Sequence, residues 1–529
     1  MKKPTLHDTL RSADVVTTNS NQRIVNLSFY FGLALSFTVL IWISLNNALY
    51  FDDGFITLRI AKNFWLGNGL YHNLQEKVQT NTSILYPVLV SPFFMFSDAT
   101  AIRLNLLFDS LLLGGATVLG FRLVYSKHVA CLPTIWAAIL GFAFPFSIAL
   151  GFVQCLSMET QLYLFFITLT FYYASIERWN LTILVSLILP YIRPEGILVP
   201  LVICLFWLPK ILTRQIRVPI WLPIVSFCII GLYPTFIYGY YGSIIPQTVL
   251  VKRLLDFTPL ASFHYLITHI LFNPKDIIVF IMSVSGFWLF VGFREKSLRL
   301  PAIWLTLYMA FFTFGAGWSA FYGWYKSPIR LFLSLFFITF TIQSYVRISW
   351  QPLRLLAILS YLLLVGRLSY NYVRNNQLFD EQDRILAATD LNKITDNQAY
   401  SVTLEPLGVM SFYNMNCTFK DFPGLASKYS YSLIKDAPKI SFDSFFTNKT
   451  YLTLIQNTNS QLIVLRRAEF DFYYPKLDHQ KLLLLGRIGN PRTHEFNGFF
   501  YVLGNLKTLS KLHVVNLKDR LEDLEKERS

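Results

Sequence analysis

The sequence predicts an all-α polytopic membrane domain of about eleven transmembrane helices, followed by a C-terminal α/β domain. Of the 529 residues, 54% are apolar and only 15% are charged, whereas an average soluble domain has roughly 25% charged residues. Apolar runs of about 18 residues or more recur from Ile24 to Tyr370, and a helix of that length crosses roughly 30 Å of hydrocarbon. We therefore expect two parts, a membrane part at residues 1–370 and a tail at residues 371–529.

Eleven apolar runs are expected to cross the membrane, and the Lys and Arg residues beside them set the orientation. The runs lie near residues 24–49, 101–121, 131–153, 161–176, 180–192, 196–209, 219–241, 277–293, 300–317, 328–346 and 355–370. The basic clusters between them all face one side if the N-terminus is cytoplasmic. The segment 85–96 is too short to span and is expected to dip into the membrane and return. The loops at 50–100, 242–275 and 318–327 and the whole tail then lie on the periplasmic side of a bacterial inner membrane.

Charge and motifs argue against several classes of function. Residues 1–370 contain 26 Lys and Arg against 13 Asp and Glu, whereas the tail contains 20 against 18. The basic excess lies in short loops beside apolar segments, so nucleic acid is not an expected partner. The sequence has no GxxxxGK[ST], HExxH, GxSxG or GxGxxG motif and no CxxC spacing. Nucleotide hydrolysis, zinc peptidase and serine hydrolase chemistry therefore have no local support.

The tail alternates strand-like and helix-like segments. Residues 401–404, 462–467 and 498–504 have the composition of strands, whereas 381–395 and 449–460 have a helical pattern. Residues 518–529 are expected to form a charged helix or a solvated end. This pattern predicts a small α/β or α+β domain.

Two adjacent carboxylates, Asp52 and Asp53, directly follow the first expected span. Ionisable groups at the edge of hydrocarbon are costly and often functional. Asp is also favoured at helix N-termini, however, and residues 56–64 look like an amphipathic interfacial helix. Helix capping and catalysis therefore both remain open for this pair.

Further polar residues are expected on the same outer face. Glu159 stands at the mouth of the fourth span, while Arg193 and Glu195 stand at a turn between two short spans, where a structural ion pair also explains them. The aromatic-rich stretches 240–253 and 317–330 add Tyr240, Gln247, Lys252, Lys326 and Arg330. Snorkelling cations and an interfacial aromatic belt are the alternative account of these stretches. Rings, cations and carboxylates on one face also suit a sugar attached to a lipid phosphate.

Several segments resemble the GT-C superfamily of polytopic glycosyltransferases that use lipid-phosphate sugars. They are FDDGFITLRIAKNFWLGNGLYHN (51–73), TSILYPVLVSPFF (82–94), SMETQLYLF (157–165), YIRPEGILVP (191–200), YYGSIIPQTVLVK (240–252), LEPLGVMSFYNM (404–415) and DFPGLAS (421–427). More narrowly, the chain looks like the branch that contains the mycobacterial terminal β-arabinofuranosyltransferases and related bacterial envelope and lipopolysaccharide glycan proteins. It departs from that branch at Gly54 and Phe55, where members often have Ala-Tyr after the two aspartates.

The resemblance implies that Asp52 or Asp53 is the general base that deprotonates the acceptor hydroxyl. We expect an inverting displacement that releases a polyprenyl phosphate. The implied partners are a polyprenyl-phosphate-linked sugar donor, an envelope glycan or glycolipid acceptor that the tail helps to bind, and membrane lipid. Some members of the superfamily also use a divalent cation, Mg or Mn. The expected donor-binding residues, whose cations stabilise the leaving phosphate, are Glu159, Arg193, Glu195, Tyr240, Gln247, Lys252, Lys326 and Arg330.

Two other classes of protein remain as rivals. A transporter or flippase of lipid-linked sugars needs similar spans, cations and aromatic residues, but it predicts inverted repeats, which the sequence does not show. The second rival is a scaffold that binds glycan through the tail and catalyses no reaction. In that case the isolated tail is expected to keep the activity of the protein.

Overall fold

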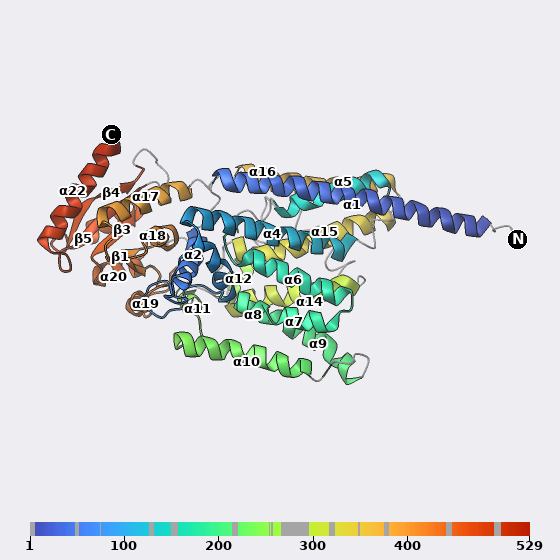
Figure 1. Ribbon diagram of the computed structural model, residues 1–529, viewed down its shortest axis with the longest axis horizontal. Helices are drawn as coiled ribbons and strands as arrows, with labels where there is room; N and C mark the ends of the chain where they lie inside the picture. The colour runs from blue at the N-terminus through green and yellow to red at the C-terminus, as the bar shows by residue number, and fades with distance from the viewer. Residues whose placement is uncertain are drawn as a thin grey trace.

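The computed structural model describes residues 6–47, 52–74, 76–125, 132–149, 157–213, 219, 221–252, 254, 258–265, 296–316, 323–347, 350–374, 380–440, 447–490 and 499–528. Within these ranges the chain is mostly helical and contains one five-stranded sheet. The long helices lie side by side along the longest axis of the molecule, with the sheet beyond one end of the bundle (Figure 1). The N-terminal end of α1 (Leu6–Asn47) projects from the other end (Figure 1).

Helices of very different lengths make up the membrane part. After α1 they are α2 (Asp52–Trp65), α3 (Leu85–Val90), η1 (Ser91–Met95), α4 (Asp98–Tyr125), α5 (Thr134–Ala149), α6 (Thr160–Ser175), α7 (Trp179–Ser186), α8 (Leu189–Ile192), η4 (Pro194–Ile197), α9 (Leu198–Leu212), α10 (Trp221–Tyr241), α11 (Gln247–Lys252), α12 (Pro259–Tyr265), α14 (Lys296–Ala310), the π-helical η7 (Phe311–Ala316), α15 (Gly323–Arg347) and α16 (Gln351–Arg374). Close packing joins α1 to α5, α4 to α6 and α15 to α16.

Five helices of the described residues are long and apolar enough to cross a membrane. They are Gln22–Trp42, Asp98–Val124, Trp221–Tyr241, Lys296–Gly315 and Tyr325–Tyr345. A largely helical, membrane-embedded protein is thus confirmed. The full set of eleven spans is not confirmed, because the runs between 131 and 209 fold as helices of 16 residues or fewer. The apolar stretch within α16, Arg354–Leu363, is also short, and the expected span at 277–293 lies outside the described residues.

The α10 helix is the most exposed of the five long apolar helices. Only 11% of its apolar window is buried, and Phe227 and Leu232 are 81% and 59% exposed. An apolar surface of this extent is typical of a helix that contacts lipid.

The α2 helix begins at the two aspartates that follow the first span. The sequence predicts an amphipathic surface helix here, but the side chains of Phe55 through Ala61 are all buried, as is Gly54. The reason is that α18 (Leu407–Tyr413) of the tail packs along α2. Phe55 meets Phe412 edge to face, with ring centroids 5.3 Å apart. The segment 85–96 forms α3 and η1, which pack against α2, and η1 also contacts α4.

The tail folds as a mixed sheet with helices between the strands. Its further elements are α17 (Asp380–Thr395), β1 (Ser401–Leu404), β2 (Thr418–Asp421), α19 (Lys428–Ile434), α20 (Lys449–Asn457), β3 (Leu462–Arg466), α21 (Arg467–Tyr473), η10 (Tyr474–Lys476), β4 (Leu482–Gly489), β5 (Phe499–Asn505) and α22 (Lys511–Arg528). The strand order is β2-β1-β3-β5-β4; the first three strands are parallel, and β5 and β4 are antiparallel to their neighbours. The strands and helices predicted for the tail are confirmed, whereas β2 and β4 are additional.

The central strand β3 is buried on both faces because helices cover the sheet from both sides. Leu462 and Val464 join the core that contains residues of α17 and α22. Ile463 and Leu465 join the second core, which contains residues of α20 and α21. The alternation follows the two-residue period of a strand.

Arg59 fastens the first loop to the tail. Its side chain is 1% exposed, and its guanidinium donates to five backbone carbonyls. They belong to His72 (2.9 Å), Cys417 (2.9 Å), Asn414 (3.2 Å), Met415 (3.2 Å) and Ser411. His72 Nε2 also bonds to Ser411 Oγ at 2.9 Å. One buried cation therefore satisfies the carbonyls at the end of α18 and holds that end against α2.

We expect Arg59→Met to loosen the tail from the membrane part. Each buried polar group that loses its partner costs roughly 1–3 kcal/mol, so the loss should be about 3 kcal/mol or more. Thermal unfolding and limited proteolysis of the purified protein measure it. Lys62→Met is the control, because the Lys62–Asp98 pair is partly exposed and such pairs contribute about 1 kcal/mol at most. Equal melting temperatures for the two variants would contradict the role of Arg59.

Candidate functional site

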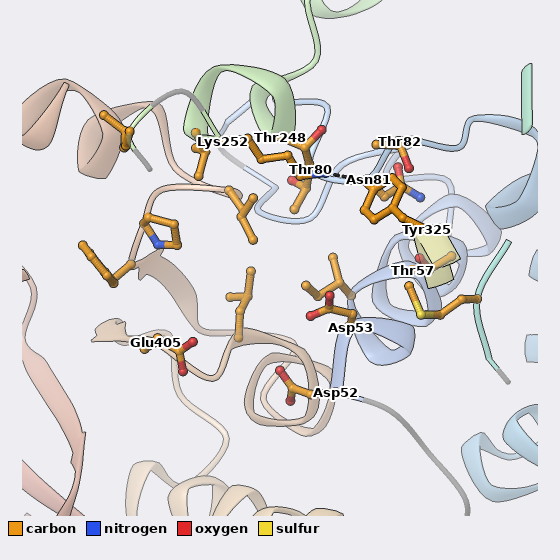
Figure 2. Close-up of a pocket in the computed structure, with 18 of the residues that line it drawn as sticks. Asp52, Asp53, Thr57, Thr80, Asn81, Thr82, Thr248, Lys252, Tyr325 and Glu405 are labelled. Carbon is orange, nitrogen blue, oxygen red and sulfur yellow. Dashed lines mark hydrogen bonds between the residues drawn. The ribbon is translucent and has the colours of Figure 1, made fainter. Parts of the chain in front are cut away.

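A cavity of about 150 Å³ lies where the membrane part meets the tail. Its walls come from α2, the loop at 80–82, the turn before α6, α11, the start of α15 and the ends of β1 and β2. Figure 2 shows these side chains converging on one space. Its polar lining is Asp52, Asp53, Thr57, Thr80, Asn81, Thr82, Glu159, Thr248, Lys252, Tyr325 and Glu405.

Asp52 is bound to the tail. Its carboxylate oxygens accept hydrogen bonds from the backbone N–H groups of Gly408 (3.1 Å) and Val409 (2.9 Å) at the start of α18. Arg384 Nη1 lies 3.6 Å from the same carboxylate. A Cβ on Gly408 would lie 1.7 Å from the backbone oxygen of Asp52. The Asp52 carboxylate is therefore occupied in joining the two parts of the protein.

Asp53 points into the cavity instead (Figure 2). Burial raises the pKa of its carboxyl group from 3.8 to about 7, and the negative charges of Asp52 and Glu405 act in the same direction. Lys252 and Arg384 oppose this shift. A carboxylate with a pKa near neutrality suits a general base, because it is ionised at working pH and still binds a proton well.

Glu405 faces Asp53 from the opposite wall (Figure 2). It directly follows β1, at the end where the parallel strands finish. Behind it, Arg466 at the end of β3 pairs with Glu405 and, at 2.9 Å, with Glu469. Arg466 is 3% exposed and Glu469 is fully buried. The charge of Glu405 is thus balanced from inside the tail.

Lys252 and Tyr325 form part of the wall that the membrane part provides. Lys252 donates to the hydroxyl of Tyr325, and its Nζ lies 4.4 Å from the centroid of that ring. The Arg193 guanidinium carbon lies 4.4 Å from the same centroid, and Arg193 pairs with Glu195 at 2.8 Å. Arg193 is fully buried and is not part of the cavity lining. Of the four cations predicted for the site, Lys252 is therefore the one that lines the cavity. Arg193 contacts the Tyr325 ring from outside the cavity and is paired there with Glu195.

Three polar groups of the wall have no partner of their own. Thr80 Oγ1, Asn81 Nδ2 and Thr248 Oγ1 are buried and make no hydrogen bond within the described ranges. Buried polar groups are nearly always hydrogen-bonded in proteins. The arrangement fits a ligand that supplies several hydroxyl or phosphate oxygens. Glu159, by contrast, accepts a bond from Thr82 at 3.1 Å.

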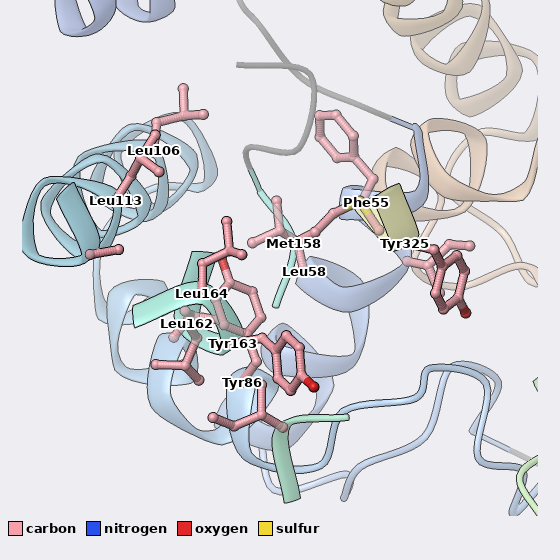
Figure 3. Packing of buried hydrophobic residues seen from close by; sticks show 14 of the residues in the cluster. Phe55, Leu58, Tyr86, Leu106, Leu113, Met158, Leu162, Tyr163, Leu164 and Tyr325 are labelled. Carbon is pink, nitrogen blue, oxygen red and sulfur yellow. The ribbon is translucent and has the colours of Figure 1, made fainter. Parts of the chain in front are cut away.

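Asp109 supports this wall from inside the bundle. It is fully buried in α4, where it accepts bonds from the Tyr86 hydroxyl (2.8 Å) and from the backbone N–H of Ser157 (2.6 Å). Ser157 has a φ of 69°, so this bond fixes the turn that leads to Glu159. Figure 3 shows Tyr86 and apolar side chains of α2, α4 and α6 that pack beneath the turn.

The remaining predicted residues lie away from the cavity lining. Tyr240 accepts a bond from the backbone N–H of Leu70 at 2.8 Å and stacks on Tyr71, which attaches the end of α10 to the first loop. Gln247 is buried and donates to the carbonyl of Gly424 at 3.1 Å. Lys326 is half-buried and Arg330 is exposed, one turn apart on α15.

For the expected divalent cation, the described residues contain no group of three or more His, Cys, Asp or Glu side chains arranged to hold a metal ion.

Sequence reasoning missed Glu405, Tyr325 and Asp109 as individual residues. A carboxylate at the carboxyl end of a parallel strand is a recognisable signal for a ligand-facing group, and Glu405 fits it. Asp109 is the only acidic residue within the apolar run 101–121, which is also a functional signal. Tyr325 lies in an aromatic-rich stretch, where no pattern distinguishes one ring from its neighbours.

The crystal structure of ArnT from Cupriavidus metallidurans in the apo state is similar to this chain. The similarity covers 91% of this chain and 98% of that one, with 11% identical residues and a TM-score of 0.49. No protein-family model matches the sequence, and no curated protein matches it.

We expect Asp53→Asn to stabilise the protein increasingly as pH rises from 4 to 7. The pKa of Asp53 is raised from 3.8 to about 7 in the folded protein. The free energy of unfolding of the wild type therefore decreases as pH rises from the unfolded-state pKa to the folded-state pKa. The neutral Asn side chain does not titrate, so the variant avoids this loss. The difference should reach up to a few kcal/mol, because one pKa unit corresponds to about 1.4 kcal/mol. Melting temperatures at pH 4.5, 6 and 8 measure it, and a difference that does not change with pH would contradict the burial of Asp53.

Gly408→Ala should separate α18 from α2, because the added methyl group has no space beside Asp52. We expect a loss of about 1–3 kcal/mol, as for other overpacked sites, and faster proteolytic release of the tail. Gly239→Ala is the matched control, since a Cβ there meets no atom within 4 Å. Unchanged stability in the Gly408 variant would show that the two helices are not held this closely.

Proposed function

We propose that the protein is a GT-C-type glycosyltransferase that moves a sugar from a polyprenyl-phosphate donor to an envelope glycan or glycolipid acceptor. The observation that carries the proposal is the cavity itself. It combines a carboxylate of raised pKa, Asp53, with Lys252 and with the unpartnered polar groups of Thr80, Asn81 and Thr248. Six of the seven segments that resemble the superfamily contribute residues to its lining.

The proposed reaction is a single displacement in which Asp53 is the base. Asp53 accepts the proton of an acceptor hydroxyl while its oxygen attacks the anomeric carbon of the donor sugar. The bond from that carbon to the phosphate oxygen breaks, and its electron pair leaves with the polyprenyl phosphate. A single displacement with Asp53 as the base and no covalent glycosyl-enzyme intermediate inverts the anomeric carbon.

Lys252 is the proposed partner of the leaving phosphate. Its ammonium group is held by Tyr325, on which Arg193 also packs, so the cation is positioned before the phosphate arrives. Thr80, Asn81 and Thr248 are suited to the hydroxyl groups of the sugar, because they offer buried hydrogen-bonding atoms. In this proposal Asp52 is an anchor that binds the first N–H groups of α18, and Asp53 is the catalytic residue of the pair.

The proposed setting is the periplasmic face of a bacterial inner membrane, with the polyprenyl chain in the lipid beside the bundle. Residues 1–370 form the transferase domain, and residues 371–529 form a periplasmic domain that closes the cavity. This placement rests on the distribution of Lys and Arg along the chain. Lipopolysaccharide and other envelope glycolipids are acceptors of suitable chemistry.

Mass spectrometry of envelope glycans from a deletion strain that carries each variant at matched protein levels tests the proposal. We expect the deletion to remove a defined sugar, and Asp53→Asn to leave it missing, with activity lowered about 10²–10⁴-fold as for other general bases. Asp52→Asn keeps one of the two acceptor oxygens that bind α18, so it weakens this anchor, leaves the base in place and should restore part of the sugar. Full restoration by Asp53→Asn would contradict the transferase and favour a transporter of the lipid-linked sugar.

A further inference from the structure

The tail contributes its own charged group to the cavity. Glu405 follows β1 and points toward Asp53 (Figure 2). Leu407, Pro423 and Leu425 of the tail also line the cavity. The unpartnered polar groups and Lys252 belong to the other wall, which the membrane part provides. The two walls therefore differ in chemistry. The wall from the membrane part carries the cation, the neutral hydrogen-bonding groups and the carboxylates Asp52, Asp53 and Glu159, whereas the tail offers one carboxylate among apolar side chains.

The carboxylate of Glu405 is held in place by a buried network. Arg466 pairs with Glu405 on one side and with Glu469 at 2.9 Å on the other. The backbone N–H of Arg466 also donates to Glu469 at 2.8 Å. Because Arg466 is buried between the two carboxylates and stays protonated, it holds Glu405 in position.

An ionised carboxylate only accepts hydrogen bonds, so it binds hydroxyl groups and repels a phosphate. A carboxylate on the wall opposite Lys252 therefore fits the acceptor and not the lipid phosphate. Because Glu405 and Asp53 face each other across the cavity, an acceptor bound between them meets both carboxylates (Figure 2).

We propose that Glu405 is the acceptor-binding residue of this site, where it accepts a hydrogen bond from an acceptor hydroxyl next to the one that reacts, and that Arg466 and Glu469 are its positioning residues. This inference rests on the proposed glycosyltransferase function. It assigns the tail a direct part in acceptor recognition, so the active site is complete only when the tail is docked.

A pH effect distinguishes this role from a purely structural one. The charged groups that act on Asp53 are Asp52, Glu405, Lys252 and Arg384. Glu405 is one of the two carboxylates that raise the Asp53 pKa. Removal of its charge should therefore lower that pKa and shift the rising limb of the pH–rate profile to lower pH.

The test uses full-length protein in lipid nanodiscs, with a total lipid extract of the deletion strain as the source of donor and acceptor. Transfer is measured as the gain in mass of the acceptor over a dilution series of the extract. Added undecaprenyl phosphate serves as a probe of the donor side through its inhibition of the reaction. The variants are Glu405→Gln and Glu405→Asp, and the control is Asp478→Asn, which changes an exposed carboxylate of the same domain.

For Glu405→Gln we expect an apparent KM raised about tenfold or more, a pH–rate midpoint shifted to lower pH, and inhibition by undecaprenyl phosphate as in the wild type. Glu405→Asp should recover part of the affinity, and Asp478→Asn should behave as the wild type. A normal KM and an unchanged midpoint in Glu405→Gln, with Asp53→Asn inactive, would overturn the inference and leave the proposed function standing. If the wild-type protein transfers nothing, the proposed function itself fails.

Arg466→Met provides a second measurement, with Arg467→Met as its exposed neighbour control. We expect Arg466→Met to raise the apparent KM as Glu405→Gln does, and Arg467→Met to leave it unchanged. Since loss of a buried cation also threatens folding, melting temperatures are measured alongside. A stably folded Arg466→Met protein with a normal KM would contradict the positioning role.

Discussion

The docking of α18 on α2 is the contact on which the rest of the site depends. Asp52 binds the first N–H groups of α18, and Arg59 binds carbonyls at its other end. The bonded residues of the two helices are more than 350 positions apart in sequence, and the helices share one buried core. Because each end of α18 is held by a charged side chain of α2, the carboxylates of Asp53 and Glu405 face each other across a defined space (Figure 2).

Charge balance distinguishes the carboxylates around this space. Asp52 is bound by backbone amides and lies near Arg384, and Glu405 is paired with Arg466. Asp53 has no such direct ion pair among the described contacts, and burial raises its pKa to about 7. A carboxylate with a pKa raised toward neutrality is a good proton acceptor at neutral pH. The proposed division between anchor, base and acceptor-binding residue follows from this difference.

The sequence predicted the features that depend on local pattern. Apolar runs indicated a helical membrane protein, and strand-like segments predicted β1, β3 and β5 of the tail. Among the expected site residues, Asp52, Asp53, Glu159 and Lys252 line the cavity. Pattern alone did not separate Asp52 from Asp53, because the difference arises from contacts with α18. The same limit applies to Glu405, whose role depends on the docking of the tail.

A structure of the full-length protein in lipid nanodiscs with undecaprenyl phosphate bound tests the central claim most directly. The proposed reaction predicts that the phosphate lies beside Lys252, in the cavity into which Asp53 points, with the tail docked through Asp52 and α18. A phosphate bound on another face of the bundle, or a tail separated from α2 in the complex, would contradict the account.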